Sequence, residues 1–395
     1  MNSIIVHYKE LALKGNNRPW FIRHLVLNLR TALGGLDVKS VREIMGRIEI
    51  QLGDDASRPE AGARISRVFG IANFSFVEKT TRDLNEIAAA ILKDVGDRKP
   101  ASFRVSARRG DKSFAFTSPQ IEYQVGGLIQ EATGWRVDLT KAELTIHIEV
   151  MPEHAFYFFD KAPGAGGLPT GTSGRVACLL SGGFDSPVAA YRMMRRGCTV
   201  LLIHFHSYPI LSRASKEKVR EIATLLTSSQ LRSRLVLVPF GELQQQVVLL
   251  APPELRVVLY RRLMMRIAEK IARAWRAKAL VTGEVVGQVA SQTLENLTVT
   301  AQATSLEILR PLIGTDKDEI IDEAKRLGTY PISVIPDQDC CQLFTPRHPA
   351  TKARLEEIEI AERALPIEQM VDSAVAASVL EEFRFPSLPA VARRA

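Results

Sequence analysis

The chain has 395 residues, 46% of them hydrophobic, which is enough for two or three domains with separate cores. The N-terminal residues have no signal-peptide pattern and no apolar run is long enough to cross a bilayer, so we expect a cytoplasmic protein without membrane segments. Four cysteines, two of them adjacent and none in a CxxC spacing, argue against a disulfide framework or a cysteine-bound metal.

The net charge of +8 is unevenly distributed along the chain. Residues 175–300 hold 18 Lys and Arg against 8 Asp and Glu, whereas residues 1–174 hold 23 against 20 and residues 301–395 hold 11 against 16. A basic middle block suits a nucleotide or a nucleic acid as partner. A generally basic surface would give the same excess, so charge alone does not decide between them.

The first part of the chain is predicted to form two small α/β units. The first, residues 1–55, has strands over 3–8, 38–41 and 47–52 and a helix over 21–33. The second, residues 56–162, alternates helices over 63–69, 83–95 and 118–133 with strands over 73–78, 103–107, 137–138, 144–150 and 155–160. Its basic turn, Arg104, Arg108, Arg109 and Lys112, fits either a phosphate contact or a solvated surface.

A glycine- and proline-rich linker over residues 163–174 leads into a third domain, residues 175–395. Apolar strands alternate there with helices, which predicts a doubly wound parallel sheet followed from about Arg354 by a helical tail. The predicted strands cover 176–180, 199–206, 235–240 and 278–282, and the predicted helices cover 187–197, 215–228 and 255–276. Ligands of such sheets bind at the carboxyl ends of the strands, here residues 179–186, 204–205 and 283 onward.

The loop Ser181–Ser186 (SGGFDS), between the first of these strands and its helix, is the strongest functional signal. Backbone N–H groups of a glycine loop below a helix N-terminus form an anion site, and we expect Ser186 to cap the helix with Pro187 in its first turn. The GxxxxGK[ST] pattern is absent, which disfavours kinase-like transfer. Asp185 would repel a polyphosphate unless Mg2+ lay between them, although an ordinary strand-turn-helix connection remains the simpler alternative.

Other polar residues fall near the same sheet edge. His204 is either a packed strand-end histidine or a contact to adenine or ribose, and Arg261 or Arg262 is expected to turn toward a nucleotide. The amide-rich loop after Gly283 can contact a base or a sugar, or brace itself. Its candidate side chains are Gln288, Ser291, Gln292 and Asn296.

Cys340 and Cys341 lie in an irregular, proline-flanked stretch, unlike Cys178 and Cys198, which lie in apolar elements. Basic residues follow them closely in the sequence, which favours a thiolate, the reactive form of cysteine. We therefore predict a chemical role for this pair.

Several long motifs in one order resemble the tRNA 4-thiouridine synthetase family, ThiI. They are SGGFDS at 181–186, HFHSYP at 204–209, TGEVVGQVASQTLENL at 282–297, RPLIGTDK at 310–317 and the linker PGAGGLPTGTSG. The SGGxDS loop by itself resembles the PP-loop of ATP pyrophosphatases, which cut ATP between the α and β phosphates. The N-terminal units are similar to the family's ferredoxin-like domain, with HYKELALKGNNRPWF, and to its THUMP domain.

The resemblance implies an ATP- and Mg2+-dependent tRNA sulfurtransferase. THUMP and its partner domain would hold the acceptor region of tRNA, O4 of uridine 8 would be adenylated, and persulfide sulfur would displace AMP from C4 to give 4-thiouridine. Asp185 corresponds to the essential loop acid, and Cys340 to the active-site cysteine, with Cys341 as substitute or helper. The residues implied to bind ATP are Leu179, Leu180, Ser181, Gly182, Gly183, Phe184, Ser186, His204, Phe205, Arg261, Gly283 and Gln292.

The sequence departs from some relatives in lacking both a rhodanese-like domain and an iron–sulfur CxxC pair. The sulfur route is therefore open: a cysteine desulfurase could load Cys340 directly, or Cys341 could resolve the intermediate as a disulfide. A role in thiamine thiazole synthesis and a symmetric homodimer are left open as well. Two other hypotheses remain, a PP-loop ligase or amidotransferase acting on a small molecule and an RNA-binding protein with a regulatory nucleotide site.

Overall fold

A computed structural model describes residues 2–336, 344 and 346–386. The chain divides into two compact units, residues 1–167 and residues 168–395, and each is described by itself. Cys340 and Cys341 lie outside the described residues.

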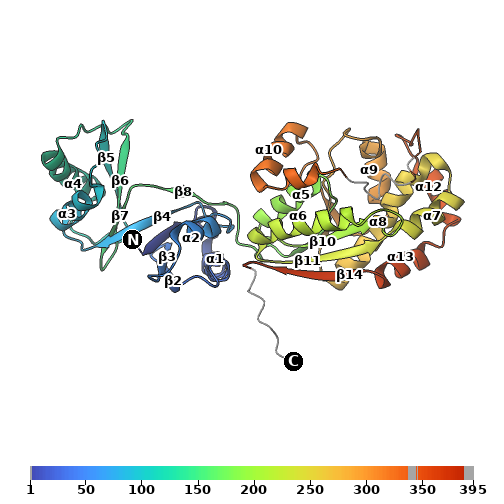
Figure 1. Cartoon of the computed structure of the whole chain (residues 1–395), viewed down its shortest axis with the longest axis horizontal. Helices are drawn as coiled ribbons and strands as arrows, with labels where there is room; N and C mark the ends of the chain where they lie inside the picture. Colours follow the sequence, from blue (N-terminus) through green and yellow to red (C-terminus); the bar gives the residue numbers. More distant parts are fainter. Residues whose placement is uncertain (1, 337–343, 345, 387–395) are drawn as a thin grey trace, which may run out of the picture. The chain divides into compact units, whose positions relative to one another are not determined.

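The first unit contains one mixed sheet with helices against it (Figure 1). Its helices are α1 (Arg18–Ala32), α2 (Arg58–Ile65), α3 (Leu84–Val95) and α4 (Ser118–Thr133). Its strands are β1 (Ser3–His7), β2 (Val38–Ile44), β3 (Arg47–Leu52), β4 (Asn73–Thr80), β5 (Phe103–Arg109), β6 (Leu144–Val150), β7 (Ala155–Phe158) and β8 (Ala162–Pro163). The strand predicted at 137–138 is reduced to a single bridge between Phe103 and Val137.

Strand β4 makes the sheet of the first unit continuous. The strand order is β2-β3-β1-β4-β7-β6-β5, in which residues 73–77 of β4 pair with β1 and residues 78–80 pair with β7. Strands β5 and β6 are parallel, and the other neighbours on this path are antiparallel. The sequence predicts a domain boundary between residues 55 and 56. One sheet contains strands from both sides of this boundary, because β4 pairs with the N-terminal strand β1.

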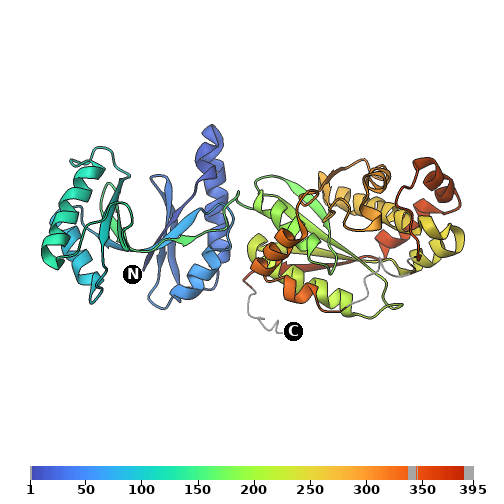
Figure 2. The same cartoon turned by 90° about the horizontal axis from the view of Figure 1, so that it is seen from above.

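Helices α3 and α4 illustrate how local sequence forms these elements. The Asp83 carboxylate caps α3 by accepting the N–H groups of Asn85 and Glu86 at 2.9 and 3.0 Å. Thr117 and Gln120 form a capping box at the start of α4. Both helices bury an apolar stripe at helical spacing against β5, β6 and β7. Figure 2 shows the two helices lying along these strands.

The second unit is a six-stranded sheet with helices on both faces. Its strands are β9 (Arg175–Leu179), β10 (Thr199–His206), β11 (Arg232–Pro239), β12 (Ala279–Val281), β13 (Glu307–Leu309) and β14 (Val379–Arg384). Its first helices are α5 (Asp185–Arg195), α6 (Ala214–Gln230), α7 (Gly241–Leu250) and α8 (Arg256–Ala274). The later ones are α9 (Leu294–Ala301), α10 (Lys317–Leu327), α11 (Tyr330–Ser333), α12 (Leu355–Arg363) and α13 (Ile367–Ala376).

The strand order β13-β12-β9-β10-β11-β14 confirms the predicted doubly wound sheet, because the first five strands are parallel. Helices α5 and α6 pack on one face, and α8 and α13 on the other. Side chains at alternate positions of β10, such as Leu201 and Ile203, enter the core beneath α8. The intervening residues, His204 among them, therefore face α5 and α6.

The prediction of a helical tail is wrong for its last part. Strand β14 pairs antiparallel with β11 and forms an edge of the sheet (Figure 1). Glu381 of β14 binds Arg220, and Glu382 binds Arg232 and Arg234. The sequence does not indicate this strand, because Val379–Arg384 is only half-apolar. A short edge strand also depends on hydrogen bonds to a neighbour that is distant in sequence. None of the helices in the described part of the chain is long and apolar enough to span a membrane.

Candidate nucleotide site

The phosphate loop occupies the predicted position between β9 and α5, with one local difference. Helix α5 begins at Asp185, and no side chain caps it at Phe184. The prediction that Ser186 is the cap is therefore wrong. Its hydroxyl instead accepts the N–H of Ser181 at 2.8 Å and lies 3.1 Å from the Ser181 Oγ. The two serines close the loop across its base, which tertiary hydrogen bonding decides rather than helix-capping preference.

Gly283, at the end of β12, lies against the loop from the neighbouring strand. A Cβ atom at this position would be 2.7 Å from the Ser186 backbone nitrogen and 2.8 Å from the Asp185 carbonyl carbon. Real Cβ atoms do not approach backbone this closely, so only glycine fits without moving the start of α5. Gly283 thus acts by fixing the position of the loop.

A cavity of about 280 Å³ opens at the carboxyl ends of β9, β10 and β12. Predicted site residues that line it are Leu179, Leu180, Ser181, Asp185, Ser186, His204, Phe205, Arg261, Gly283 and Gln292. Three predicted residues, Gly182, Gly183 and Phe184, do not line it. Ser291, a predicted candidate for a base or sugar contact, lines it too. The cavity is also bounded by Met264, Met265, Thr282, Glu284 and Val289, which the sequence analysis did not assign to ATP binding.

Asp185 carries a carboxylate oxygen without a partner. Its Oδ2 accepts a hydrogen bond of 3.3 Å from the side-chain amide of Gln288, whereas its buried Oδ1 has no hydrogen-bond partner within the described structure. Burial raises the pKa of Asp185, and the Gln288 hydrogen bond and the charge of Lys317 act in the opposite direction. A carboxylate held in this way can be stabilised further by a cation.

Glu284 differs from Asp185 because its carboxylate is surrounded by hydrogen-bond donors. It is 2% exposed and forms ion pairs with Arg261 and Arg310, and its Oε2 accepts the Thr282 hydroxyl at 2.9 Å. Arg261 also donates to Ser291 Oγ at 3.0 Å. This network orients Arg261 along the cavity wall. No charge pattern in the sequence indicates these ion pairs of Glu284, because its partners lie 23 and 26 residues away on other elements.

The structure also decides among alternatives that the sequence left open. Both ring nitrogens of His204 are engaged, with Leu180 O at 2.9 Å and Ser215 Oγ at 3.0 Å, so this histidine is packed although it borders the cavity. Arg262 points away and binds Glu362 of α12. Asn296 is fully buried and braces the loop by donating to the carbonyl oxygens of Ala290 and Ala350.

The described cysteines are structural in character. Cys178 and Cys198 are buried free thiols, and burial raises the pKa of Cys178 to about 12. The predicted reactive pair, Cys340 and Cys341, lies outside the described residues and stays a prediction.

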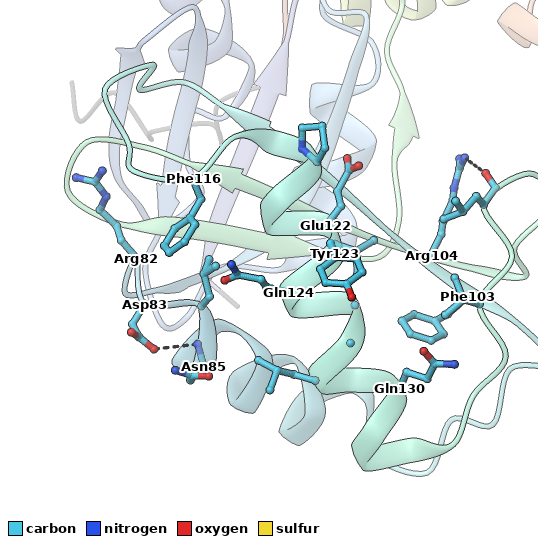
Figure 3. Close-up of a pocket in the computed structure, with 18 of the residues that line it drawn as sticks. Arg82, Asp83, Asn85, Phe103, Arg104, Phe116, Glu122, Tyr123, Gln124 and Gln130 are labelled. Carbon is cyan, nitrogen blue, oxygen red and sulfur yellow. Dashed lines mark hydrogen bonds between the residues drawn. The ribbon is translucent and has the colours of Figure 1, made fainter.

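The first unit has a larger hollow of its own, of about 840 Å³ (Figure 3). It lies between α4, which contributes Glu122, Tyr123 and Gln130, and the start of α3 with Arg82. Arg104 of the predicted basic turn borders it and donates to the Leu139 carbonyl at 3.2 Å. The Tyr123 ring is 85% exposed. An exposed aromatic ring near arginines suits unpaired nucleotides better than a small apolar ligand.

The fold and site define a PP-loop domain of the ATP-pyrophosphatase type in one chain with an α/β unit suited to RNA. Family comparisons agree. Residues 171–367 match the family described as Thiamine biosynthesis protein (ThiI), residues 3–75 match the ThiI ferredoxin-like domain and residues 78–160 match the THUMP domain.

Curated relatives extend over nearly the whole chain. A probable tRNA sulfurtransferase of Thermus thermophilus is 47% identical over 382 residues, covering 97% of this chain and 94% of its own length. One of Moorella thermoacetica is 42% identical, covering 93% and 94% respectively. A 4-thiouridine synthetase solved in complex with RNA and ATP is 35% identical, with a TM-score of 0.87 over 97% of this chain and 99% of its own. The chain belongs to the ThiI family of tRNA sulfurtransferases.

Proposed function

We propose that this chain uses ATP to replace O4 of uridine 8 in tRNA with sulfur, giving 4-thiouridine. One observation carries the proposal: the cavity beside the phosphate loop holds Asp185 with an unpartnered oxygen, in a chain similar throughout to a synthetase solved with RNA and ATP. A small-molecule ligase would have no use for the THUMP unit, and a regulatory nucleotide site would not need this acid.

Several described residues have chemistry that suits ATP. Backbone N–H groups of Gly182, Phe184 and Asp185 would bind phosphate oxygens, because those of Ser181 and Gly183 donate to serine hydroxyls within the loop. The apolar side chains of Leu179, Leu180 and Phe205 would surround the adenine. Arg261, already oriented by Glu284, would contact the ribose or the α-phosphate. Charged groups that are fixed before the substrate binds lose little freedom on binding, which favours affinity.

The residues present also fit Mg2+. Asp185 Oδ1 and Gln288 Oε1 are both buried oxygens without a hydrogen-bond partner among the described residues, and oxygen atoms are the ligands that Mg2+ prefers. Within the described residues no group of three or more His, Cys, Asp or Glu could hold a metal. One carboxylate plus substrate phosphates is a usual arrangement for Mg2+, so Asp185 would hold the ion together with ATP. The ion would neutralise phosphate charge as the bond to pyrophosphate breaks.

The proposed reaction has three steps. O4 of the uridine attacks the α-phosphorus, the bond to the β-phosphate oxygen breaks, and pyrophosphate leaves with the electron pair. Terminal sulfur of a Cys340 persulfide then attacks C4, and the C4–O4 bond breaks with release of AMP. Attack of the Cys341 thiolate on the Cys340 sulfur would free 4-thiouridine and leave a disulfide, which a cellular thiol must reduce. A cysteine desulfurase would supply the persulfide.

The experiment compares the wild-type chain with Asp185→Asn and Cys340→Ser on tRNA carrying U8 or C8. We expect AMP and pyrophosphate release only with U8, and 4-thiouridine in nucleoside mass spectra when a desulfurase and cysteine are present. Cys340→Ser is expected to keep adenylation and lose thiolation, and Asp185→Asn to lose both. Formation of ADP in place of AMP, or equal turnover on U8 and C8, would contradict the proposal.

A further inference from the structure

Lys218 of α6 lies directly against Gly182 of the phosphate loop. A Cβ atom built on Gly182 would be 2.9 Å from Lys218 Cδ, 3.5 Å from Cε and 3.6 Å from the ammonium nitrogen. The lysine stem therefore crosses the Cα of Gly182, and the charged end lies beside the loop. The first helical turns after this loop supply no lysine, so Lys218 reaches the loop from the next helix in the chain.

The face of α6 that carries Lys218 is the face that borders the nucleotide site. Ser215, three residues earlier, is hydrogen-bonded to His204 at the cavity edge. Residues three apart on a helix lie on the same side, so Ser215 and Lys218 both point toward the carboxyl ends of the strands. Lys216 lies on another side of α6, where its ammonium is 5.0 Å from the centre of the Tyr208 ring.

The Lys218 ammonium donates a hydrogen bond of 2.7 Å to the carbonyl oxygen of Ile335. Within the described residues no carboxylate forms an ion pair with it, and the acceptor of its hydrogen bond is a neutral carbonyl. A phosphate oxygen is a much stronger acceptor for an ammonium than a peptide carbonyl is. Exchange of the Ile335 carbonyl for a phosphate oxygen is therefore favourable.

Other cations near the site already have carboxylate neighbours. Arg261 and Arg310 both pair with Glu284, and the charge of Lys317 acts on Asp185. The β- and γ-phosphates of ATP carry most of its negative charge, and pyrophosphate gains more as it leaves. A cation that does not have to leave an acid is the better partner for that charge.

We propose that Lys218 binds the β- and γ-phosphates of ATP and the pyrophosphate that they become, moving from the Ile335 carbonyl to phosphate oxygen. The proposal rests on the ATP use proposed above and deepens it by assigning the end of ATP that leaves. AMP, which lacks these phosphates, is not contacted by Lys218.

The test measures binding of inorganic pyrophosphate, ATP and AMP by calorimetry with Mg2+ present. The variants are Lys218→Met, Lys218→Arg and, as a matched control, Lys216→Met, which removes the same charge two residues away. Loss of a charge-assisted hydrogen bond predicts that Lys218→Met weakens pyrophosphate and ATP binding by about tenfold or more. AMP affinity is expected to stay within about twofold, which also reports that the variant is folded. Lys218→Arg should restore part of the loss, because a guanidinium also donates to phosphate.

Equal losses in Lys218→Met and Lys216→Met would overturn the assignment, since general surface charge would then explain them. An equal loss of AMP and ATP affinity in Lys218→Met would overturn it too, because the lysine would then support the whole site. The proposed function fails separately, when the wild-type chain makes no AMP from ATP and tRNA. Pyrophosphate binding is measured without turnover, so it decides the role of Lys218 in that case as well.

Discussion

Two acids, a buried one in the first unit and a partly buried one in the second, have opposite environments. Glu149 in β6 is 3% exposed, accepts a hydrogen bond of 2.9 Å from His7 of β1, and pairs with Arg47 of β3. Burial alone would raise the pKa of Glu149, but His7 and Arg47 together hold it below the usual value. Asp185 has one amide donor, its other oxygen has no partner in the part of the chain that the structure describes, and burial raises its pKa.

The difference separates an acid that stabilises the fold from one that binds a ligand. Glu149 joins strands of the first sheet from both sides of β4, and its charge is balanced by protein groups. Asp185 keeps coordination capacity that the described protein does not use, at a cost in folding free energy. Removing the charge of Glu149 should therefore change stability, and removing that of Asp185 should change activity most.

The largest effect is expected for Asp185→Asn. AMP formation should fall by about 100-fold or more, because the variant loses the negative oxygen that would hold a divalent cation. The unfolding midpoint should rise by about 1–3 °C, because a poorly compensated buried charge is gone. Pyrophosphate release and thermal melting measure the two changes. A variant that loses activity and stability together would assign Asp185 a structural role and remove the contrast.

Glu149→Gln should lower stability and leave activity unchanged. The free energy of unfolding should drop by about 3 kcal/mol, because Arg47 is left buried without its partner. Adenylation per folded molecule should stay near the wild-type value. Urea denaturation followed by circular dichroism measures the first effect, and Asp138→Asn, at a partly exposed turn of the same unit, is the control. Unchanged stability would show that the Glu149 cluster contributes nothing net.

Gly283→Ala tests whether the position of Asp185 depends on its backbone neighbours. The added methyl group would displace the start of α5, and overpacking of this kind costs about 1–3 kcal/mol. We expect ATP affinity to fall by about tenfold with AMP affinity falling alongside it. Gly314→Ala, where a Cβ meets nothing within 4 Å, is the matched control. Equal affinities in the two variants would contradict the close approach described above.

The smallest effect is the pH dependence of the two stability changes. The pKa of Glu149 is lowered from 4.5, so its stabilisation is complete above that pH and is lost as pH falls through the folded-state value. The pKa of Asp185 is raised from 3.8, so its charge begins to destabilise the fold above that pH and does so fully above the folded-state value. The difference between each variant and wild type should shrink on acidification, with opposite signs. Denaturation series between pH 3 and 7 would check this, and a common sign would contradict it.

The sequence by itself determined the elements with strong local signals. Periodicity and capping residues predict the glycine loop between an apolar strand and a helix, and also the buried stripes of α3 and α4. The rule for doubly wound sheets predicts that ligands bind at the carboxyl ends of the strands. The order of the motifs along the chain was sufficient to identify the family. These features depend on neighbours close in the chain, which is why they can be read from it.

Tertiary structure decided which polar side chains meet. Ser186 bonds to Ser181 rather than capping α5, Arg261 rather than Arg262 reaches the cavity, and Glu284 and Lys218 gain their roles from residues on other elements. Strand β14 likewise depends on β11 for its hydrogen bonds. Long-range pairing of this kind leaves no period or spacing in a single sequence, because each partner is chosen by packing rather than by its chain neighbours.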